Sequence, residues 1–235
     1  MAVPAVNRQI RLHARPTGVA GPEHFRTAEE AVRRPDSGEV LLETLYVSVD
    51  PAMRVWMNED PGYQPPIPLG SVMRSGGVAR VLESRAEGLS AGDLVQGGIG
   101  WQSHPTLAGE GVERLDEALG TPEDWLHALG VPGLTAWFGL FRIGALKPGE
   151  TVLVSAAAGA VGQMAVQIAK AEGCRVVGLA GGAEKCTLLR DELGVDAVID
   201  HRAVAGDGWG PFAEAMQAAL GGRDADVYFD NVGGA

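Results

Sequence analysis

The chain of 235 residues is long enough for one large domain or two modest ones. Its net charge of −11 argues against nucleic acid or an anionic membrane as a general partner. No apolar run reaches the roughly 18 residues of a membrane-spanning helix, and the N-terminal stretch lacks the apolar region of a signal peptide. We therefore expect a cytoplasmic protein. Its two cysteines, Cys174 and Cys186, provide neither a disulfide framework nor a metal-ligand spacing.

The first half of the chain is typical of short strands separated by Gly and Pro turns. Alternating or β-rich stretches span residues 8–14, 39–49, 71–84 and 93–104. A long proline-rich loop spans residues 50–68. This pattern predicts a partly open β-barrel.

The second half alternates strands with amphipathic helices. Helices are predicted over residues 121–130 and within 133–150, where Gly144 and Pro148 end the second helix, and the alternation starts at Thr151. Strands are expected at 151–156, 175–181, 197–200 and 226–231, and helices at 160–173, 183–194 and 209–222. Such alternation predicts a parallel sheet with helical crossovers. The fold class is therefore α/β, with a domain boundary near residues 120–133.

A glycine-bearing turn, "SAAAGAVGQ", follows the first of these strands and opens a helix. The dinucleotide-binding pattern G-x-G-x-x-G falls on residues 157–162, with Ala157 in place of the first glycine and with Gly159 and Gly162 retained. In this context the turn predicts that a pyrophosphate lies at the helix N-terminus. Tight packing of the helix on the strand, without a ligand, is the alternative.

The tip of the next strand carries no acidic residue. NAD-binding sites place an Asp or Glu there for the ribose hydroxyls, whereas this tip reads Gly181–Gly182 and is followed by Lys185. His201 and Arg202 follow the third strand and are expected near the same place. An open tip with nearby cations favours NADP over NAD. Solvent-exposed cations without a ligand are the alternative.

Segments along almost the whole chain resemble the medium-chain dehydrogenase/reductase superfamily. The resemblance is strongest to its zinc-free branch of prostaglandin and curcumin reductases. It is carried by "NRQIRLHARPTG", "YVSVDPAMRVWM", "PPIPLGSVMRSGGVARV", "VPGLTAWFGL", "KPGETVLVSAAAGAVGQMAVQIAK" and "YFDNVGG". It implies a GroES-like β-barrel domain over residues 1–125, lacking its C-terminal return, beside a Rossmann-type doubly wound parallel sheet over 126–235. That sheet is incomplete, with about four strands.

The resemblance also implies an activity, namely hydride transfer from NADPH to the double bond of α,β-unsaturated ketones or aldehydes. The partner is then a small enone-type molecule, with no nucleic acid and no membrane, and a homodimer stays open. Zinc-dependent relatives carry Cys and His-Glu ligands in the barrel domain. The matching stretch 68–77 has none, so we expect no metal.

The site residues implied by the resemblance fall into two groups. Tyr63 is the candidate catalytic residue, a hydrogen-bond donor to the oxygen that becomes negative in the enolate. His201 stands where the family typically has a tyrosine near the 2′-phosphate. The cofactor-binding residues are Thr135, Ala158, Gly159, Ala160, Val161, Gly162, Gly181, Lys185, His201 and Asn231.

Two other functions stay open at this point. A quinone reductase of the same superfamily would use the same cofactor on a different substrate. A truncated, catalytically silent nucleotide-binding protein is the other, because the sequence ends at the tip of the fourth predicted strand, whereas a complete dinucleotide domain has six.

Overall fold

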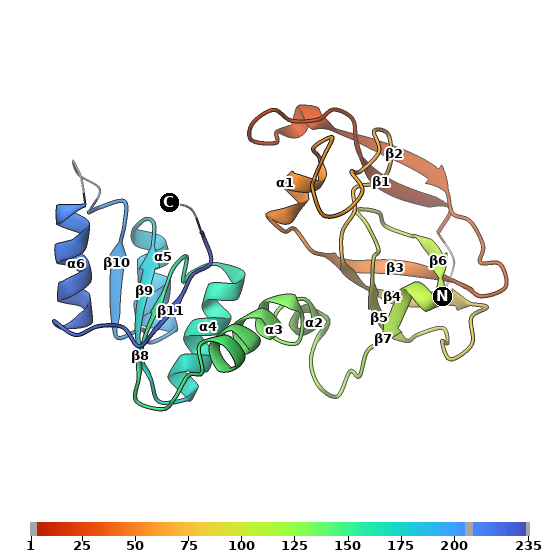
Figure 1. The fold of residues 1–235 in the computed structure, drawn as a ribbon. Helices are drawn as coiled ribbons and strands as arrows, with labels where there is room; N and C mark the ends of the chain where they lie inside the picture. The colour runs from red at the N-terminus through yellow and green to blue at the C-terminus, as the bar shows by residue number, and fades with distance from the viewer. Residues whose placement is uncertain (1–3, 205–208, 234–235) are drawn as a thin grey trace. The chain divides into compact units, whose positions relative to one another are not determined.

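The computed structural model describes residues 4–204 and 209–233 (Figure 1). The chain forms two compact units, Met1–Leu126 and His127–Ala235. Each unit has its own sheet and its own hydrophobic core.

The first unit is built on a five-stranded antiparallel sheet in the order β6-β3-β4-β5-β7. Alternating residues of its central strands, such as Val40 and Leu42, point to one face and form a fully buried cluster. The pairing of β3 with β4 shifts register twice, and bulges of this kind increase the twist of a sheet. The strands are β3 (Glu39–Val47), β4 (Gly77–Ser84), β5 (Leu94–Gly97), β6 (Thr106–Ala108) and β7 (Val112–Arg114).

A two-stranded ribbon of β1 (Val6–Leu12) and β2 (Phe25–Ala31) completes the strands described in this unit. Isolated bridges join β1 to the rest of the unit, one between Gln9 and Gln102 and one between Arg11 and Val72. The result is a curled antiparallel half-barrel, which confirms the predicted GroES-like architecture.

Two arginines hold the long proline-rich loop, which begins with the short helix α1 (Ala52–Trp56). Arg15 donates hydrogen bonds to the carbonyl oxygens of Met57 (2.6 Å) and Ile67 (3.2 Å). Arg54 donates to the carbonyl oxygen of Pro16 at 2.8 Å. Arg54 thus ties the loop to the segment that contains Pro16.

The second unit contains a four-stranded parallel sheet in the order β10-β9-β8-β11. Its second and third strands along the chain lie on one side of the first strand, and the fourth lies on the other side. This is the strand order of a Rossmann fold up to its switch point. The strands are β8 (Thr151–Val154), β9 (Arg175–Ala180), β10 (Ala197–Asp200) and β11 (Val227–Phe229).

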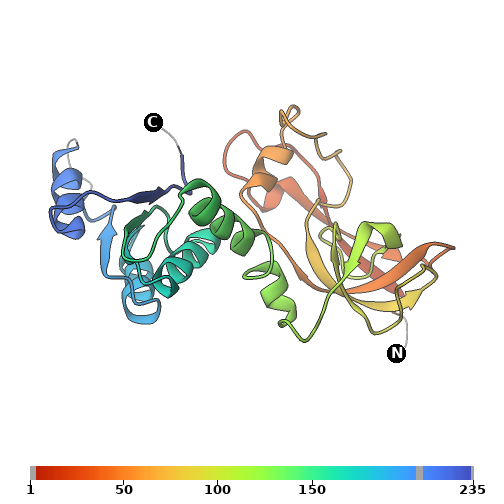
Figure 2. The same cartoon turned by 60° about the horizontal axis from the view of Figure 1, so that its bottom comes forward.

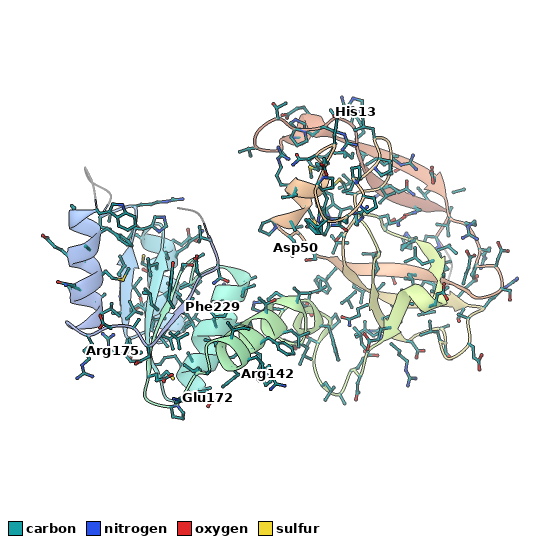
Figure 3. The ribbon with its side chains drawn as sticks, in the orientation of Figure 1. His13, Asp50, Arg142, Glu172, Arg175 and Phe229 are labelled. Atoms are coloured by element: carbon teal, nitrogen blue, oxygen red, sulfur yellow. The ribbon has the colours of Figure 1, made fainter. Side chains whose placement is uncertain are left out.

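Helices cover both faces of this sheet, as Figure 2 shows. One face packs on α3 (Val131–Trp137), α4 (Ala160–Ala171) and α5 (Ala183–Thr187). The other face packs on α6 (Gly210–Leu220). Phe229 of β11 belongs to the first of these cores, where the side chains can be followed in Figure 3. The predicted doubly wound α/β sheet of four strands is confirmed.

The helices before this sheet differ from the prediction. The stretch 121–130 forms only α2 (Pro122–Leu126), and α3 begins after Gly130, whose backbone is extended. Beyond α3 the chain continues as a π-helix, η3 (Phe138–Ile143), with Gly139 packed on the ring of Phe229.

Candidate functional site

The turn between β8 and α4 brings the backbone and the helix into close contact. A Cβ on Gly162 would lie 2.3 Å from the carbonyl oxygen of Ala156 and 2.8 Å from Cα of Ala157. Ala156 itself has a positive φ of 43°. Only glycine at position 162 lets the first turn of α4 rest on this loop, as the predicted fingerprint requires.

Ala157 stands where the fingerprint usually has its first glycine, and the structure explains why alanine fits. Its side chain is fully buried, and its N–H donates to the carbonyl oxygen of Leu179 on β9 at 2.9 Å. A Cβ on Gly178 would lie 3.1 Å from the methyl of Ala157. The Ala157 methyl therefore occupies space that a glycine in the neighbouring strand leaves free.

The N-terminus of α4 presents free hydrogen-bond donors. Gly159 is its N-cap and provides no side-chain cap. The N–H groups of Ala160, Val161 and Gly162 have no acceptor within residues 4–204 and 209–233. Three free donors at the positive end of a twelve-residue helix form an anion-binding site that fits a pyrophosphate. Ala158 precedes this cradle, and its carbonyl oxygen accepts a hydrogen bond from Gln163 at 3.0 Å.

Asn231 lies beside the same turn and holds it to β11. Its backbone N–H donates to Oγ of Ser155 at 2.7 Å, and its side-chain amide donates to the carbonyl oxygen of Ser155 at 3.0 Å. Oγ of Ser155 in turn donates to Oδ1 of Asp230 at 2.6 Å. This Ser155–Asp230–Asn231 clasp joins the carboxyl ends of β8 and β11, the switch point of the sheet.

Asp230 remains a carboxylate in this clasp. The hydrogen bond from Ser155 and those from the N–H groups of Val232 and Gly233 lower the pKa of Asp230. Sequence reasoning missed Ser155 and Asp230. Their signal was available: polar residues that follow neighbouring parallel strands meet at one edge of a sheet.

The tip of β9 brings Gly181 and His201 together with a third residue, Arg202. A Cβ on Gly181 would lie 2.8 Å from Nε of Arg202 and 2.9 Å from Nε2 of His201. Both side chains therefore lie against the backbone of Gly181. Lys185 is exposed on α5, three residues beyond Gly182.

Asp200, at the end of β10, fixes the backbone of this tip. Its Oδ1 accepts hydrogen bonds from the N–H groups of Gly182 (2.9 Å) and Arg202 (3.0 Å). The hydrogen bond from Gly182 is the main reason why the pKa of Asp200 is lowered. Gly182 has a positive φ of 98°, a conformation that favours glycine.

Tyr63 lies in the first unit, in the proline-rich loop, and is 65% exposed. The indole N–H of Trp56 donates a hydrogen bond to the Tyr63 hydroxyl oxygen. The guanidinium of Arg74 lies 5.8 Å from the centre of the Trp56 ring and donates to the carbonyl oxygen of Pro65. Tyr63 thus accepts one hydrogen bond from Trp56, and its own O–H has no acceptor among the residues that the structure describes.

A hollow of about 550 Å³ lies elsewhere in the first unit, between β1 and β3. Tyr63 does not line it. The lining residues are Arg8, Gln9, Ile10, Thr27, Thr44, Leu45, Val47, Val49, Trp101, Gln102 and Ser103.

Thr135 lies on the exposed side of α3, next to the buried Ala136. The described residues of the two units contain no group of three or more His, Cys, Asp or Glu side chains that could hold a metal ion. Within the same ranges, every helix is too short or too polar to cross a bilayer.

A curled antiparallel half-barrel followed by a Rossmann-type sheet with this glycine turn defines the class of medium-chain dehydrogenases and reductases. Two family models match the chain. One is described as the N-terminal domain of oxidoreductase (residues 8–115), and the other as zinc-binding dehydrogenase (residues 160–235). The chain belongs to the medium-chain dehydrogenase/reductase family.

Individual relatives point to one branch of the family. The chain is 44% identical over 228 residues to the NADPH-dependent curcumin reductase of Escherichia coli, covering 97% of the chain and 64% of the relative. It is 42% identical over 208 residues to prostaglandin reductase 1 of Rattus norvegicus, covering 85% of the chain and 57% of the relative. The chain therefore spans less than two thirds of the length of these relatives.

A solved structure resembles the chain along nearly its full length. The structure of CurA from Vibrio vulnificus in complex with NADPH matches with a TM-score of 0.86 and 40% identity. The match covers 97% of this chain and 65% of that one. The resemblance to these reductases therefore extends from sequence to fold.

Proposed function

We propose that this chain is an NADPH-dependent reductase that transfers hydride to the carbon–carbon double bond of α,β-unsaturated ketones or aldehydes. The observation that carries the proposal is the candidate cofactor site of the second unit. There a glycine turn with free N–H donors is followed by a strand, β9, that ends without an acidic residue, beside His201 and Lys185. The similarity to an NADPH-bound CurA and to curcumin and prostaglandin reductases supports the same cofactor and reaction class.

The residues of the second unit would hold the cofactor along the carboxyl edge of its sheet. The first turn of α4 (residues 160–162) would bind the pyrophosphate through its free backbone N–H groups, and Ala158 and Gly159 would lie against it in the preceding turn. Gly181, Lys185 and His201 would receive the adenosine 2′-phosphate. Strand β9 itself ends without an acidic residue, whose carboxylate would repel that phosphate. The nearby carboxylate of Asp200 accepts the N–H groups of Gly182 and Arg202.

We assign Asn231 to the nicotinamide side of the cofactor and Thr135 to the lining of the cofactor site. Asn231 follows β11, across the switch point from the adenosine tip. One N–H of its side-chain amide donates to Ser155, which leaves its side-chain oxygen and the second N–H for a ligand. The clasp keeps this oxygen in a fixed place.

NADPH supplies the hydride when it is bound. Hydride addition moves negative charge onto the carbonyl oxygen of the substrate, and a hydrogen-bond donor at that oxygen lowers the barrier. Tyr63 is our candidate donor. Trp56 already satisfies one lone pair of the Tyr63 hydroxyl oxygen, and the phenolic hydroxyl has its own O–H to donate.

The test is turnover by the purified 235-residue chain. We expect oxidation of NADPH with simple enones, slower oxidation with quinones, and a preference for NADPH over NADH. Faster turnover of quinones would support the quinone reductase instead. Stabilisation of the fold by NADPH without turnover of any enone would support a silent nucleotide-binding protein. The cytoplasmic location and the homodimer stay predictions.

A further inference from the structure

We propose that Arg202 selects NADPH over NADH by binding the adenosine 2′-phosphate, and that Gly181 is a positioning residue for Arg202. The inference rests on the proposed function only for the identity of the cofactor. Arg202 joins the residues assigned to the 2′-phosphate above. Glycine at position 181 leaves the space that the Arg202 side chain occupies.

The first argument is the close approach at the tip of β9. Nε of Arg202 lies 2.8 Å from the place where a Cβ on Gly181 would be, and Cε1 of His201 lies at the same distance. Nη1 of Arg202 lies 3.9 Å from the corresponding place on Gly182. The guanidinium therefore crosses the tip of the second strand of the sheet. In a Rossmann fold this tip lies beside the adenosine ribose.

The second argument is that the guanidinium has no acceptor. Its N–H groups make no hydrogen bond or ion pair within the part of the chain that the structure describes. Other arginines pair with acids through two hydrogen bonds, as Arg33 does with Glu39 and Arg80 with Glu117. In a chain with 30 acidic residues and 19 basic ones, an arginine that leaves its planar fork free is suited to an external anion.

The third argument is that the nearest carboxylate fixes Arg202 through its backbone. Oδ1 of Asp200 accepts the N–H groups of Gly182 and of Arg202, at 2.9 Å and 3.0 Å. These bonds tie the end of β10 to the tip of β9 and set the direction in which the Arg202 side chain leaves. The guanidinium thus retains its donors for a ligand.

Arginine and lysine have different roles in this arrangement. A guanidinium offers parallel N–H donors that match two oxygens of one phosphate, whereas an ammonium acts as a point charge. Lys185 extends from α5, beyond Gly182, and adds charge without this geometry. We therefore expect Arg202 to provide the discrimination and Lys185 to strengthen it.

The first experiment is isothermal titration calorimetry of the wild-type chain and the Arg202→Ala variant with NADPH, NADH, 2′,5′-ADP and 5′-AMP. We expect the substitution to lower the affinities for NADPH and 2′,5′-ADP by about tenfold to a hundredfold, because charge-assisted hydrogen bonds are lost. NADH and 5′-AMP should change by less than about twofold. Arg202→Lys should fall between the two.

The matched control is Arg223→Ala, which removes the same charge from an exposed arginine in the loop before β11. This loop lies at the end of the sheet where its strands begin, as Arg175 does in Figure 3. The Arg223→Ala substitution should leave the affinities for all four ligands unchanged. Melting temperatures of all variants show whether the fold is intact.

The second experiment tests Gly181. A methyl at this position would meet Arg202 and His201 at 2.8 Å and displace both. Gly181→Ala should therefore lower the affinity for 2′,5′-ADP more than the affinity for 5′-AMP. Gly210→Ala is the control, because its Cβ would meet nothing within 4 Å.

The outcomes separate this inference from the proposed function. If Arg202→Ala lowers the affinities for NADPH and NADH equally, or changes neither affinity, the inference is wrong even though the enzyme reduces enones. If the wild-type chain does not prefer NADPH, the inference falls together with the cofactor part of the proposed function. If the selective loss occurs and no enone is reduced, the inference holds and the proposed reaction is wrong.

Discussion

Substitution of Gly162 by alanine should disrupt the turn that we assign to the pyrophosphate. The new Cβ would lie 2.3 Å from the carbonyl oxygen of Ala156 and 2.8 Å from Cα of Ala157. Both are backbone atoms, so no side-chain rotation relieves the contact. An ordinary contact begins near 3.4 Å, so the first turn of α4 must retreat by roughly 1 Å.

The magnitude follows from two opposing effects. Overpacking of this kind lowers the free energy of unfolding by about 1–3 kcal/mol. Replacing a helical glycine by alanine raises it by up to about 1 kcal/mol, because alanine favours the helix. We expect the free energy of unfolding to fall by about 1–2 kcal/mol. The same displacement moves the N–H groups of residues 160–162, so NADPH should bind about tenfold more weakly.

Urea unfolding followed by circular dichroism measures the stability, and calorimetry measures the affinity. Gly159→Ala provides a graded comparison, because its Cβ would lie 3.1 Å from the oxygen of Ala156, and Gly210→Ala provides the control. The expected order of damage is Gly162, then Gly159, then Gly210. A Gly162→Ala variant with wild-type stability and wild-type affinity for NADPH would refute the reasoning.

Three further predictions test other parts of the molecule. Tyr63→Phe should lower kcat on an enone by about a hundredfold with little change in KM, because a donor to the developing oxyanion is lost; an unchanged kcat would remove Tyr63 from the mechanism. Asp230 has a lowered pKa in the fold, so its carboxylate stabilises the protein above the unfolded pKa of about 3.9, and this contribution is lost as the pH falls through the lower folded pKa. Asp230→Asn should therefore be less stable than wild type at pH 7, with a difference in melting temperature that shrinks below about pH 4; a constant difference would contradict the assignment. Dialysis against EDTA should leave turnover unchanged, since residues 68–77 carry no zinc ligand, and loss of activity that zinc restores would overturn this expectation.

The local parts of the candidate site could be predicted from the sequence. A strand, a glycine turn and a helix succeed one another within about twenty residues, so the spacing of Gly159 and Gly162 predicted both the turn and its free N–H donors. The absence of an acid at Gly181–Gly182 is likewise a local feature. Local backbone geometry determines these features, and they need no knowledge of distant segments.

The sequence did not show where α2 and α3 end. The helical pattern between Gly133 and Gly144 gives no sign of the change from α3 to a π-helix at Phe138, where Gly139 packs closely on Phe229. That contact joins residues ninety positions apart along the chain. Hydrophobic periodicity predicts which side of a helix is buried, but it does not predict which other segment packs against that side.

The sequence by itself determined the class of fold and the position of the glycine turn, and the acid-free end of the second strand predicted NADP rather than NAD, because each depends on short-range spacing. Only the tertiary structure decided which polar groups meet. Ser155 contacts Asp230 and Asn231 because β8 and β11 are neighbours in the sheet, although 75 positions separate Ser155 from Asp230. Arg202 crosses Gly181 because β10 lies beside β9 and a glycine leaves the space. Long-range packing sets the order of the strands. That order places the polar groups of both contacts at the carboxyl edge of the parallel sheet.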